Sequence, residues 1–176
     1  MRFIETPVDG AYIIEPTRHA DERGTFAMLW GQAELVERGL RGTFVQGNHS
    51  FSPISGTLRG LHWQAPPHSQ AKLIRCVAGS VFDVIVDLRP ESPTFLRWAE
   101  LKLSARDLRL AYVPEKCAHG YLTLEGNTEV LYLVSTGYHP EVERGIRWDD
   151  PLFKIDWPAV ASTVSPRDLG WPDYVA

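Results

Sequence analysis

The chain has 176 residues, of which 44% are hydrophobic and 23% are charged, a composition that fits one globular domain over residues 1–176 and excludes a long disordered tail. The formal net charge is −4 and no run of lysine or arginine occurs, which argues against nucleic acid as the main partner. We find no apolar stretch of membrane-spanning length and no signal-peptide pattern, so we expect a cytoplasmic protein with no membrane partner.

Alternation of apolar and polar residues is the dominant pattern, and only one helix is predicted in the first half, at residues 32–38 before Gly39. The alternation is clearest at residues 81–88, where it places Asp83 and Asp87 on one face and predicts that this face is solvated. The strands predicted in this way are, in chain order, 43–50, 57–63, 71–77, 81–88, 97–103, 109–113 and 129–136.

Turn-forming residues separate these strands at 79–80, 90–93 and 125–127. Many short strands with one helix do not support βαβ units, so the pattern favours an all-β sandwich or jelly roll with few short helices. From residue 148 onward the chain is rich in Asp, Pro and Trp, which predicts irregular segments and short helical turns around the body. Cys76 and Cys117 lack the spacing of a disulfide framework, and we expect free thiols.

Two histidines are the first candidates for chemistry. His62 lies in a predicted strand, on the same face as Leu58 unless Gly60 bulges the strand, and His119 follows a proline-containing segment. A single histidine in a strand is more often a hydrogen-bonded structural residue than a catalyst, so both interpretations stay open on the residues alone.

Paired histidines in an all-β domain also suggest a metal cupin. Metal cupins typically place two histidines two residues apart, with a glutamate shortly after. Here Gln64 stands two residues after His62, and the next stretch offers only His68. Because this ligand set is incomplete, we expect neither a metal nor another cofactor; three histidines that converge from separate strands remain the alternative.

Lys72 and Tyr132 both fall within predicted strands. For Lys72 the residue pattern favours a solvated outer face, since lysine is rarely buried without a partner. For Tyr132, which shares a face with Val130 and Val134, ordinary core packing and a role in a concave site are equally open.

Six short runs follow one another in the middle of the chain: VQGNHSFS (45–52), LRGLH (58–62), QAKL (70–73), VFDV (81–84), VDLR (86–89) and SPTF (92–95). Taken together and in order, they resemble the signature runs of the dTDP-4-dehydrorhamnose 3,5-epimerase family. The match extends to residues 21–26, 114–120, 129–138, 143–151 and 155–158, so it spans nearly the whole chain.

The resemblance implies a cupin-like jelly roll that forms a homodimer, needs no metal and inverts C5 and C3 of a 4-keto-6-deoxy sugar on a nucleoside diphosphate. His62 matches the family's general base, Asp168 its partner, and Tyr132 the acid on the opposite face of the sugar. Lys72 and His119 match residues around the keto sugar. The implied substrate-binding positions are Arg23, Phe26, Met28, Gln46, Asn48, Arg59, His119, Tyr138, Glu143 and Arg167.

This chemistry accounts for the residue types. A hydrogen next to a ketone leaves only if the enolate is stabilised, which a cationic Lys72 near the C4 oxygen would do. A neutral imidazole with a pKa of about 7 can take the proton, and a carboxylate such as Asp168 would fix its tautomer. Inversion then needs Tyr132 to return a proton to the other face.

Three positions depart from the family pattern. Met28 stands where a glutamate is usual near the nucleoside, Leu133 where a lysine is usual, and Arg167 where a lysine is usual; one residue is also added within 53–56. Because Met28 bears on the nucleotide, a GDP- or CDP-linked keto sugar, or a heptose, stays an alternative. A noncatalytic sugar-nucleotide binding protein and a metal cupin oxygenase or isomerase are the competing functions.

Overall fold

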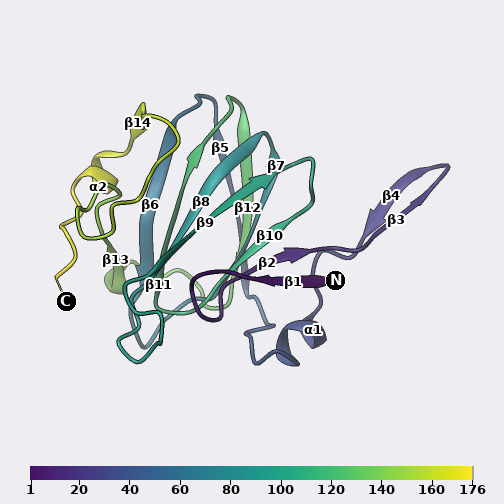
Figure 1. Ribbon diagram of the computed structural model, residues 1–176, viewed down its shortest axis with the longest axis horizontal. Helices are drawn as coiled ribbons and strands as arrows, with labels where there is room; N and C mark the ends of the chain where they lie inside the picture. The colour runs from purple at the N-terminus through teal and green to yellow at the C-terminus, as the bar shows by residue number, and fades with distance from the viewer. Residues whose placement is uncertain (176) are drawn as a thin grey trace.

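Two β-sheets that face each other form the body of the chain in the computed structural model, which describes residues 1–175 (Figure 1). Ala176, the last residue of the predicted domain, lies outside the described residues. The predicted all-β sandwich is confirmed. The strands and helices are β1 (Arg2–Glu5), β2 (Tyr12–Glu15), β3 (Arg18–Asp21), β4 (Gly24–Ala27), α1 (Gln32–Val36), β5 (Gln46–Ser52), β6 (Thr57–Gln64), β7 (Lys72–Ala78), β8 (Ser80–Asp87), β9 (Trp98–Ser104), β10 (Leu110–Val113), β11 (Cys117–Thr123), β12 (Thr128–Val134), the 3-10 helix η1 (Pro140–Val142), β13 (Glu143–Gly145), β14 (Thr163–Val164) and α2 (Pro166–Leu169).

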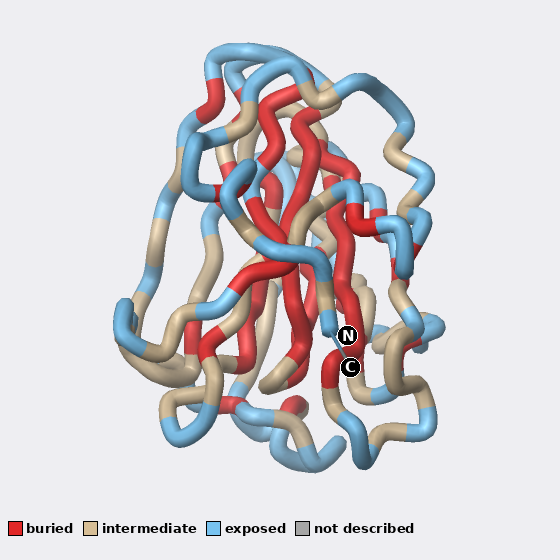
Figure 2. Tube along the Cα trace, turned by 90° about the vertical axis from the view of Figure 1, so that its left-hand side faces the viewer, coloured by how far each residue is buried: buried red, intermediate tan, exposed pale blue. Residues whose placement is uncertain are grey.

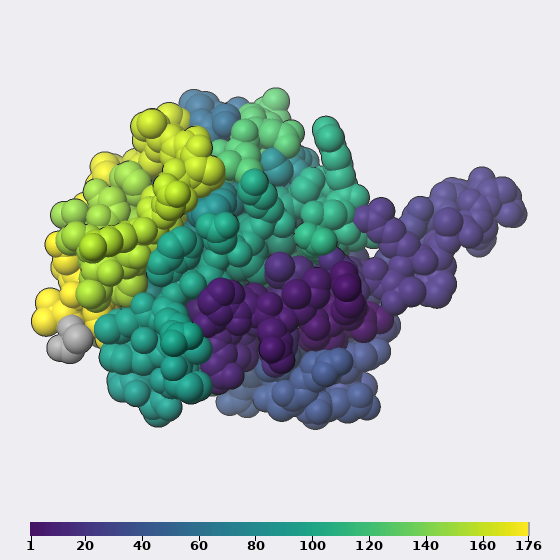
Figure 3. Space-filling view, in the orientation of Figure 1, coloured from purple at the N-terminus to yellow at the C-terminus, as the bar shows by residue number. Residues whose placement is uncertain are grey.

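The first sheet has the strand order β1-β2-β10-β7-β12-β5, and the second has the order β13-β6-β11-β8-β9. Neighbouring strands in these orders are antiparallel, whereas the short strand β14 pairs with β6 in parallel. Strands β3 and β4 pair with each other as a separate hairpin that projects away from the body (Figures 1 and 3).

The core lies between the two sheets, where the buried strands run side by side through the centre of the molecule (Figure 2). Ile74 from the first sheet and Ile85 from the second are fully buried there. A second apolar cluster lies on the other side of the second sheet, where Phe82 and Val84 pack under Trp157 of the C-terminal segment. The irregular segment after residue 148 therefore covers the outer face of this sheet, as the composition predicts.

This cover explains why one prediction for β8 is wrong. Asp83 and Asp87 were expected on a solvated face, but both are 0% exposed. The apolar face of β8 lies under the C-terminal segment, so the aspartate face is turned into the interior. Each buried carboxylate instead has polar partners, as buried charges require, although Oδ1 of Asp83 has no hydrogen-bond partner among the described residues.

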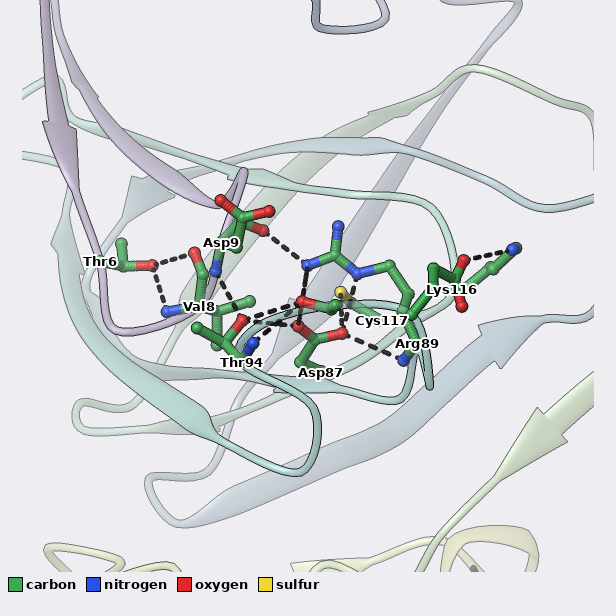
Figure 4. A network of polar contacts seen from close by, with 10 residues as sticks. Thr6, Val8, Asp9, Asp87, Arg89, Thr94, Lys116 and Cys117 are labelled. Atoms are coloured by element: carbon green, nitrogen blue, oxygen red, sulfur yellow. Dashed lines mark hydrogen bonds and ion pairs between the residues drawn. The ribbon is translucent and has the colours of Figure 1, made fainter.

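The partners of Asp87 form a polar cluster at the end of β8 (Figure 4). Its carboxylate accepts hydrogen bonds from Arg89 Nε (2.8 Å), Ser92 Oγ (2.6 Å) and Thr94 Oγ1 (2.7 Å). Arg89 also donates to the carbonyl of Asp9, which ties this loop to the N-terminal segment. Burial alone would raise the pKa of Asp87, but these hydrogen bonds lower it to about 2.

The predicted elements between residues 32 and 136 are all present. The helix at 32–38 is α1, and each of the seven predicted strands corresponds to one observed strand with ends shifted by three residues or fewer. Both cysteines are free and buried, as expected. Among residues 1–175 no helix is both long enough and apolar enough to cross a membrane.

Candidate active site

A bulge in β6 brings two of the predicted residues to the same side of the sheet. His62 pairs with His119 on β11, but Arg59 pairs with Tyr121, so two residues of β6 oppose the single residue Gly120. Gly60 has a φ of +124°, and a Cβ atom there would lie 2.6 Å from the Cα atom of Gly120. Only glycine fits such a close approach. The bulge lets His62 and Arg59 both line the space between the sheets.

This space is a cavity of about 780 Å³ between the two sheets, closed on one side by the segment that contains β14 and α2. Its volume lies in the range of small-molecule binding sites. Residues of β5, β7 and β12 form one wall, and residues of β6, β11 and β13 form the other. The predicted residues that line it are Gln46, Asn48, Arg59, His62, Lys72, His119, Tyr132, Tyr138, Glu143, Arg167 and Asp168.

His62 and Asp168 form a hydrogen-bonded pair in this cavity. His62 Nε2 lies 2.5 Å from Asp168 Oδ1, and Asp168 is 4% exposed. The helix α2 positions the carboxylate, because the side chain of Ser165 caps the helix by accepting from the backbone N–H of Asp168 (3.0 Å). Burial alone would raise the pKa of Asp168, but the hydrogen bond from His62 lowers it overall. Asp168 is therefore a carboxylate that can orient the imidazole.

Lys72 lies on the cavity side of β7, which corrects the expectation of a solvated outer face. The residue is 9% exposed, and its Nζ donates to the backbone carbonyl of His62 (3.2 Å). Burial lowers the pKa of Lys72 to about 8, although Glu143 and Asp83 oppose this shift. The ammonium is thus a cation with little water around it, and it lies on the cavity wall that faces the strand of His62.

His119 is paired with Asp83, a residue that the strand pattern had placed in solvent. His119 Nε2 lies 2.8 Å from Asp83 Oδ2. Burial lowers the pKa of His119, with Asp83 opposing, so the imidazole is neutral at pH 7. The sequence alone did not single out Asp83. The apolar face of a half-buried strand normally faces the core, so the aspartate face of β8 was expected in solvent.

Tyr132 reaches the cavity from β12, on the wall opposite His62. Burial raises its pKa, so the phenol keeps its proton at neutral pH. A second phenol, Tyr121, also lines the cavity and lies 2.7 Å from Ser50 Oγ. Burial raises the pKa of Tyr121 to about 12. Tyr121 was not among the predicted site residues, because a tyrosine in a buried strand cannot be told from a core residue by spacing.

Polar side chains surround the outer part of the cavity. Gln46 donates to Asn48 Oδ1 (2.7 Å) and accepts from the backbone N–H of Tyr138 (3.1 Å). The Tyr138 hydroxyl donates to Glu143 Oε2 (2.5 Å), which is also paired with Arg167. The Tyr138 ring itself is 50% exposed, so one of its faces is available to a ligand.

Three of the predicted substrate-binding residues lie outside this cavity. Arg23 and Phe26 belong to the projecting β3–β4 hairpin and Met28 follows it (Figure 3). Phe26 is 71% exposed, and Arg23 is paired with Asp21 of the same hairpin. A single chain therefore does not bring these three residues to the other site residues.

Comparison with known proteins identifies the type of site. A family model described as dTDP-4-dehydrorhamnose 3,5-epimerase matches residues 5–175. The chain belongs to this family. A relative with the same description from Methanothermobacter thermautotrophicus is 44% identical over 173 residues, which cover 97% of this chain and 92% of the relative.

Two solved structures of epimerases have the same fold as this chain. The dTDP-4-dehydrorhamnose 3,5-epimerase from Elizabethkingia anophelis NUHP1 is 39% identical with a TM-score of 0.96, over 99% of this chain and 96% of that one. The dTDP-6-deoxy-D-glucose-3,5-epimerase from Legionella pneumophila, solved with dTDP-4-keto-L-rhamnose, is 39% identical with a TM-score of 0.90, over 98% and 92%. These structures confirm the predicted cupin-like fold. As a member of the epimerase family, this chain is an isomerase.

Two observations weaken the competing functions. Leu133, a departure from the epimerase pattern, does not line the cavity and instead packs beside the apolar cluster of Leu73 and Tyr112. The two departures Met28 and Leu133 are the support for the noncatalytic interpretation, which thus loses one of them. Within the described chain, the one group of three metal-capable side chains in mutual reach is His68, His139 and Glu141, outside the cavity, so no converging ligand set supports a metal cupin at His62.

Proposed function

We propose that this epimerase converts dTDP-4-dehydro-6-deoxyglucose into dTDP-4-dehydrorhamnose by removing and returning protons at C5 and C3 of the sugar. The observation that carries the proposal is the placement of His62 and Tyr132 on facing walls of one cavity. A planar enolate between them would have a base on one face and an acid on the other, which is what inversion requires.

His62 is the base in this proposal. Its Nε2 is occupied by Asp168, so Nδ1 is the ring nitrogen that takes the substrate proton. The imidazolium that forms is stabilised by the buried carboxylate of Asp168. This arrangement resembles other catalytic histidines whose second nitrogen is held by an aspartate.

Lys72 is the group that stabilises the enolate. With a pKa of about 8, it is mostly protonated at pH 7 and offers a cation where the negative charge develops on the C4 oxygen. A charge is more effective in this buried position than in water, because the local dielectric is lower. Neutral His119, held by Asp83, is suited to a hydrogen bond with a sugar hydroxyl.

The nucleoside diphosphate lies in the outer part of the cavity in our proposal. Arg59 has an exposed side chain whose one side-chain hydrogen bond is to the carbonyl of Phe51 (3.3 Å), so most of its donors are free for phosphate oxygens. The exposed ring of Tyr138 would stack on the base, with Gln46, Asn48 and Arg167 around it. GDP- and CDP-linked keto sugars are the alternative substrates, because Met28 replaces a usual glutamate.

We further propose that the enzyme works as a homodimer in which the β3–β4 hairpin of one copy completes the cavity of the other. The hairpin pairs only with itself in the described part of the chain and carries the exposed Phe26 at its base. An exposed aromatic residue on a projecting two-stranded hairpin is best explained by a partner surface, since isolated hairpins are marginally stable in water.

Solvent deuterium incorporation tests the proposed activity. The enzyme is incubated in D₂O with dTDP-, GDP- and CDP-linked 4-keto-6-deoxyglucose, and label at C3 and C5 is followed by mass spectrometry and NMR. We expect incorporation at both carbons, fastest with the dTDP sugar. Incorporation no greater than in an enzyme-free control with all three sugars would refute the proposed activity, and faster labelling of the GDP or CDP sugar would refute the nucleotide.

A further inference from the structure

Two imidazole rings and a carboxylate come together outside the cavity, on the segment after β6 and on the segment that leads into and includes η1. The rings of His68 and His139 are stacked, with centroids 3.6 Å apart and planes 11° from parallel. His139 Nδ1 lies 3.0 Å from Glu141 Oε1. One ligand atom of each of the three residues lies within 4.8 Å of the others.

The backbone under these side chains is held by the buried amide of Gln64, which is 3% exposed. Its Nε2 donates to the carbonyl of His68 (2.7 Å) and to that of Gly137 (3.1 Å), while its Oε1 accepts from the backbone N–H of His139 (2.7 Å). The backbone N–H of Ala65 also donates to the carbonyl of Val142 (3.0 Å). The juxtaposition of the three side chains is therefore fixed by the fold of both loops.

We propose that His68, His139 and Glu141 form a binding site for one borderline divalent transition-metal ion, of the Zn²⁺ class. Two imidazoles and one carboxylate are a donor set that suits Zn²⁺ and Co²⁺, with the fourth position open to water. Mg²⁺ and Ca²⁺ prefer ligand shells made of oxygen and are not suited to it. This site is separate from the cavity and has no part in the proposed proton transfers.

Binding requires a small rearrangement of side chains. A metal ion lies in the plane of each imidazole that binds it, so one of the two stacked rings has to turn. The ligand atoms of a tetrahedral zinc site are roughly 3.3 Å apart, given Zn–N distances of about 2.0–2.1 Å, and those of the three residues lie within 4.8 Å of one another, so no pair has to approach by more than about 1.5 Å. The half-exposed rings and the exposed Glu141 can make this movement without disturbing the core.

The position of the site suggests what a bound ion would do. Tyr138, which lines the cavity, stands between Gly137 and His139 in the loop that Gln64 holds. An ion shared by His68 and His139 would link this loop to the one at residues 65–70. Because an ion that binds only the folded chain stabilises it, the melting temperature should rise with Zn²⁺.

Metal titration tests the proposal. The untagged full chain, first dialysed against a chelator, is titrated with Zn²⁺ by calorimetry and with Co²⁺ by visible absorption. We expect one ion per chain, no competition from Mg²⁺, and a loss of affinity of at least about tenfold in both His68→Ala and His139→Ala, as is common when metal ligation is disturbed. His49→Ala is the matched control, because His49 has a similar glutamate partner, Glu129 at 3.0 Å, but belongs to no such group.

The results that would overturn the proposal are distinct from failure of the epimerase activity. Equal Zn²⁺ affinity in the wild type and His139→Ala would place any ion elsewhere, and loss of affinity in His62→Ala alone would place it in the cavity. Absence of binding in the wild type at 1:1 and tenfold excess of Zn²⁺ would also refute it. Circular dichroism of each variant shows whether the fold is kept.

Discussion

The His62 Nε2 atom lies 2.5 Å from Asp168 Oδ1, which joins a strand in the first half of the chain to the last helix. The contact fixes which ring nitrogen faces the cavity. It also means that α2, a helix of four residues, carries one of the groups on which the proposed chemistry depends. Proper docking of the C-terminal segment is therefore required for an oriented base.

Asp168→Asn tests this relationship. The variant keeps the shape of the side chain but removes the negative charge, so His62 loses the partner that stabilises its protonated form. We expect kcat to fall by about 10²–10⁴-fold with a smaller change in KM, as for other histidines that lose an aspartate partner. Asp173→Asn, on an exposed residue of the same segment, is the control and should leave kcat unchanged. A fall of less than threefold would contradict the role of Asp168.

Lys72→Met should abolish activity and stabilise the fold. The pKa of a lysine in the unfolded chain is about 10.5, whereas the pKa of Lys72 in the folded chain is about 8, so between these pH values the unfolded state binds more protons. The free energy of unfolding should therefore rise with pH through this range, by about 3 kcal/mol, and Lys72→Met should remove that rise.

Urea denaturation at pH 7 and pH 10 measures this effect, with Lys102→Met on the exposed side of β9 as the control. At pH 7 the Lys72→Met variant should be more stable than the wild type and at least about 100-fold less active, because the enolate loses its cation. An unchanged pH dependence of stability, or activity within tenfold of the wild type, would contradict our account of Lys72.

Asp87→Asn should weaken the fold but not the chemistry. The carboxylate accepts from Arg89, Ser92 and Thr94, and its removal leaves the partly buried Arg89, whose side chain is 16% exposed, without its charge partner; loss of a fully buried pair costs about 3–5 kcal/mol, so we expect a smaller loss here. We expect a lower urea midpoint and an unchanged KM. Asp156→Asn, on an exposed residue, is the control. A loss of stability below about 0.5 kcal/mol would show that the cluster contributes little.

The stability of the wild-type protein at acid pH also measures the contribution of the Asp87 carboxylate. The pKa of Asp87 is about 2 in the folded chain, against an ordinary value of 3.8 in the unfolded chain, so the unfolded state binds more protons between these pH values. Stability from this carboxylate, about 2 kcal/mol, is present above pH 4 and lost as pH falls through 2. The slope should be smaller in Asp87→Asn.

Much of the sandwich could be predicted because its strands between residues 43 and 136 follow a period of two. For β8 the same period led to a wrong prediction. The pattern shows that the two faces of the strand differ, but it does not show which face is exposed to solvent. Strand β11 was missed for a related reason: all seven of its residues are buried, so there is no alternation to detect. The first four strands are four residues each, too short for a periodic pattern.

The sequence predicted the types of residue in the site better than the contacts between these residues. Spacing alone could not join His62 to Asp168, which are 106 residues apart. The family resemblance supplied that pairing, and the structure places both residues in contact. By contrast, the pairing of His119 with Asp83 depends on which face of β8 is buried, and in our proposal the role of Arg23 depends on a second copy of the chain.

Mixing two inactive variants tests the proposed role of the hairpin. Arg23→Ala has an intact cavity, whereas His62→Ala has an intact hairpin. If the hairpin acts in its partner, mixed dimers regain one complete site, and an equal mixture that has been dissociated and reassembled should reach about a quarter of the wild-type rate. No recovery after reassembly, or a monomer in analytical ultracentrifugation, would contradict the proposal.

The opposite placement of His62 and Tyr132 is the central claim, and comparing proton exchange with inversion tests it most directly. In D₂O with the dTDP-linked keto sugar, we follow label and product stereochemistry in His62→Ala and Tyr132→Phe. His62→Ala should lose both proton exchange and inversion, because no proton is removed from the sugar. Tyr132→Phe should keep exchange at the His62 face while inversion falls by at least about 100-fold, since the proton returns to the face it left. Equal loss of exchange and inversion in Tyr132→Phe, or full exchange in His62→Ala, would contradict a base and an acid on opposite faces.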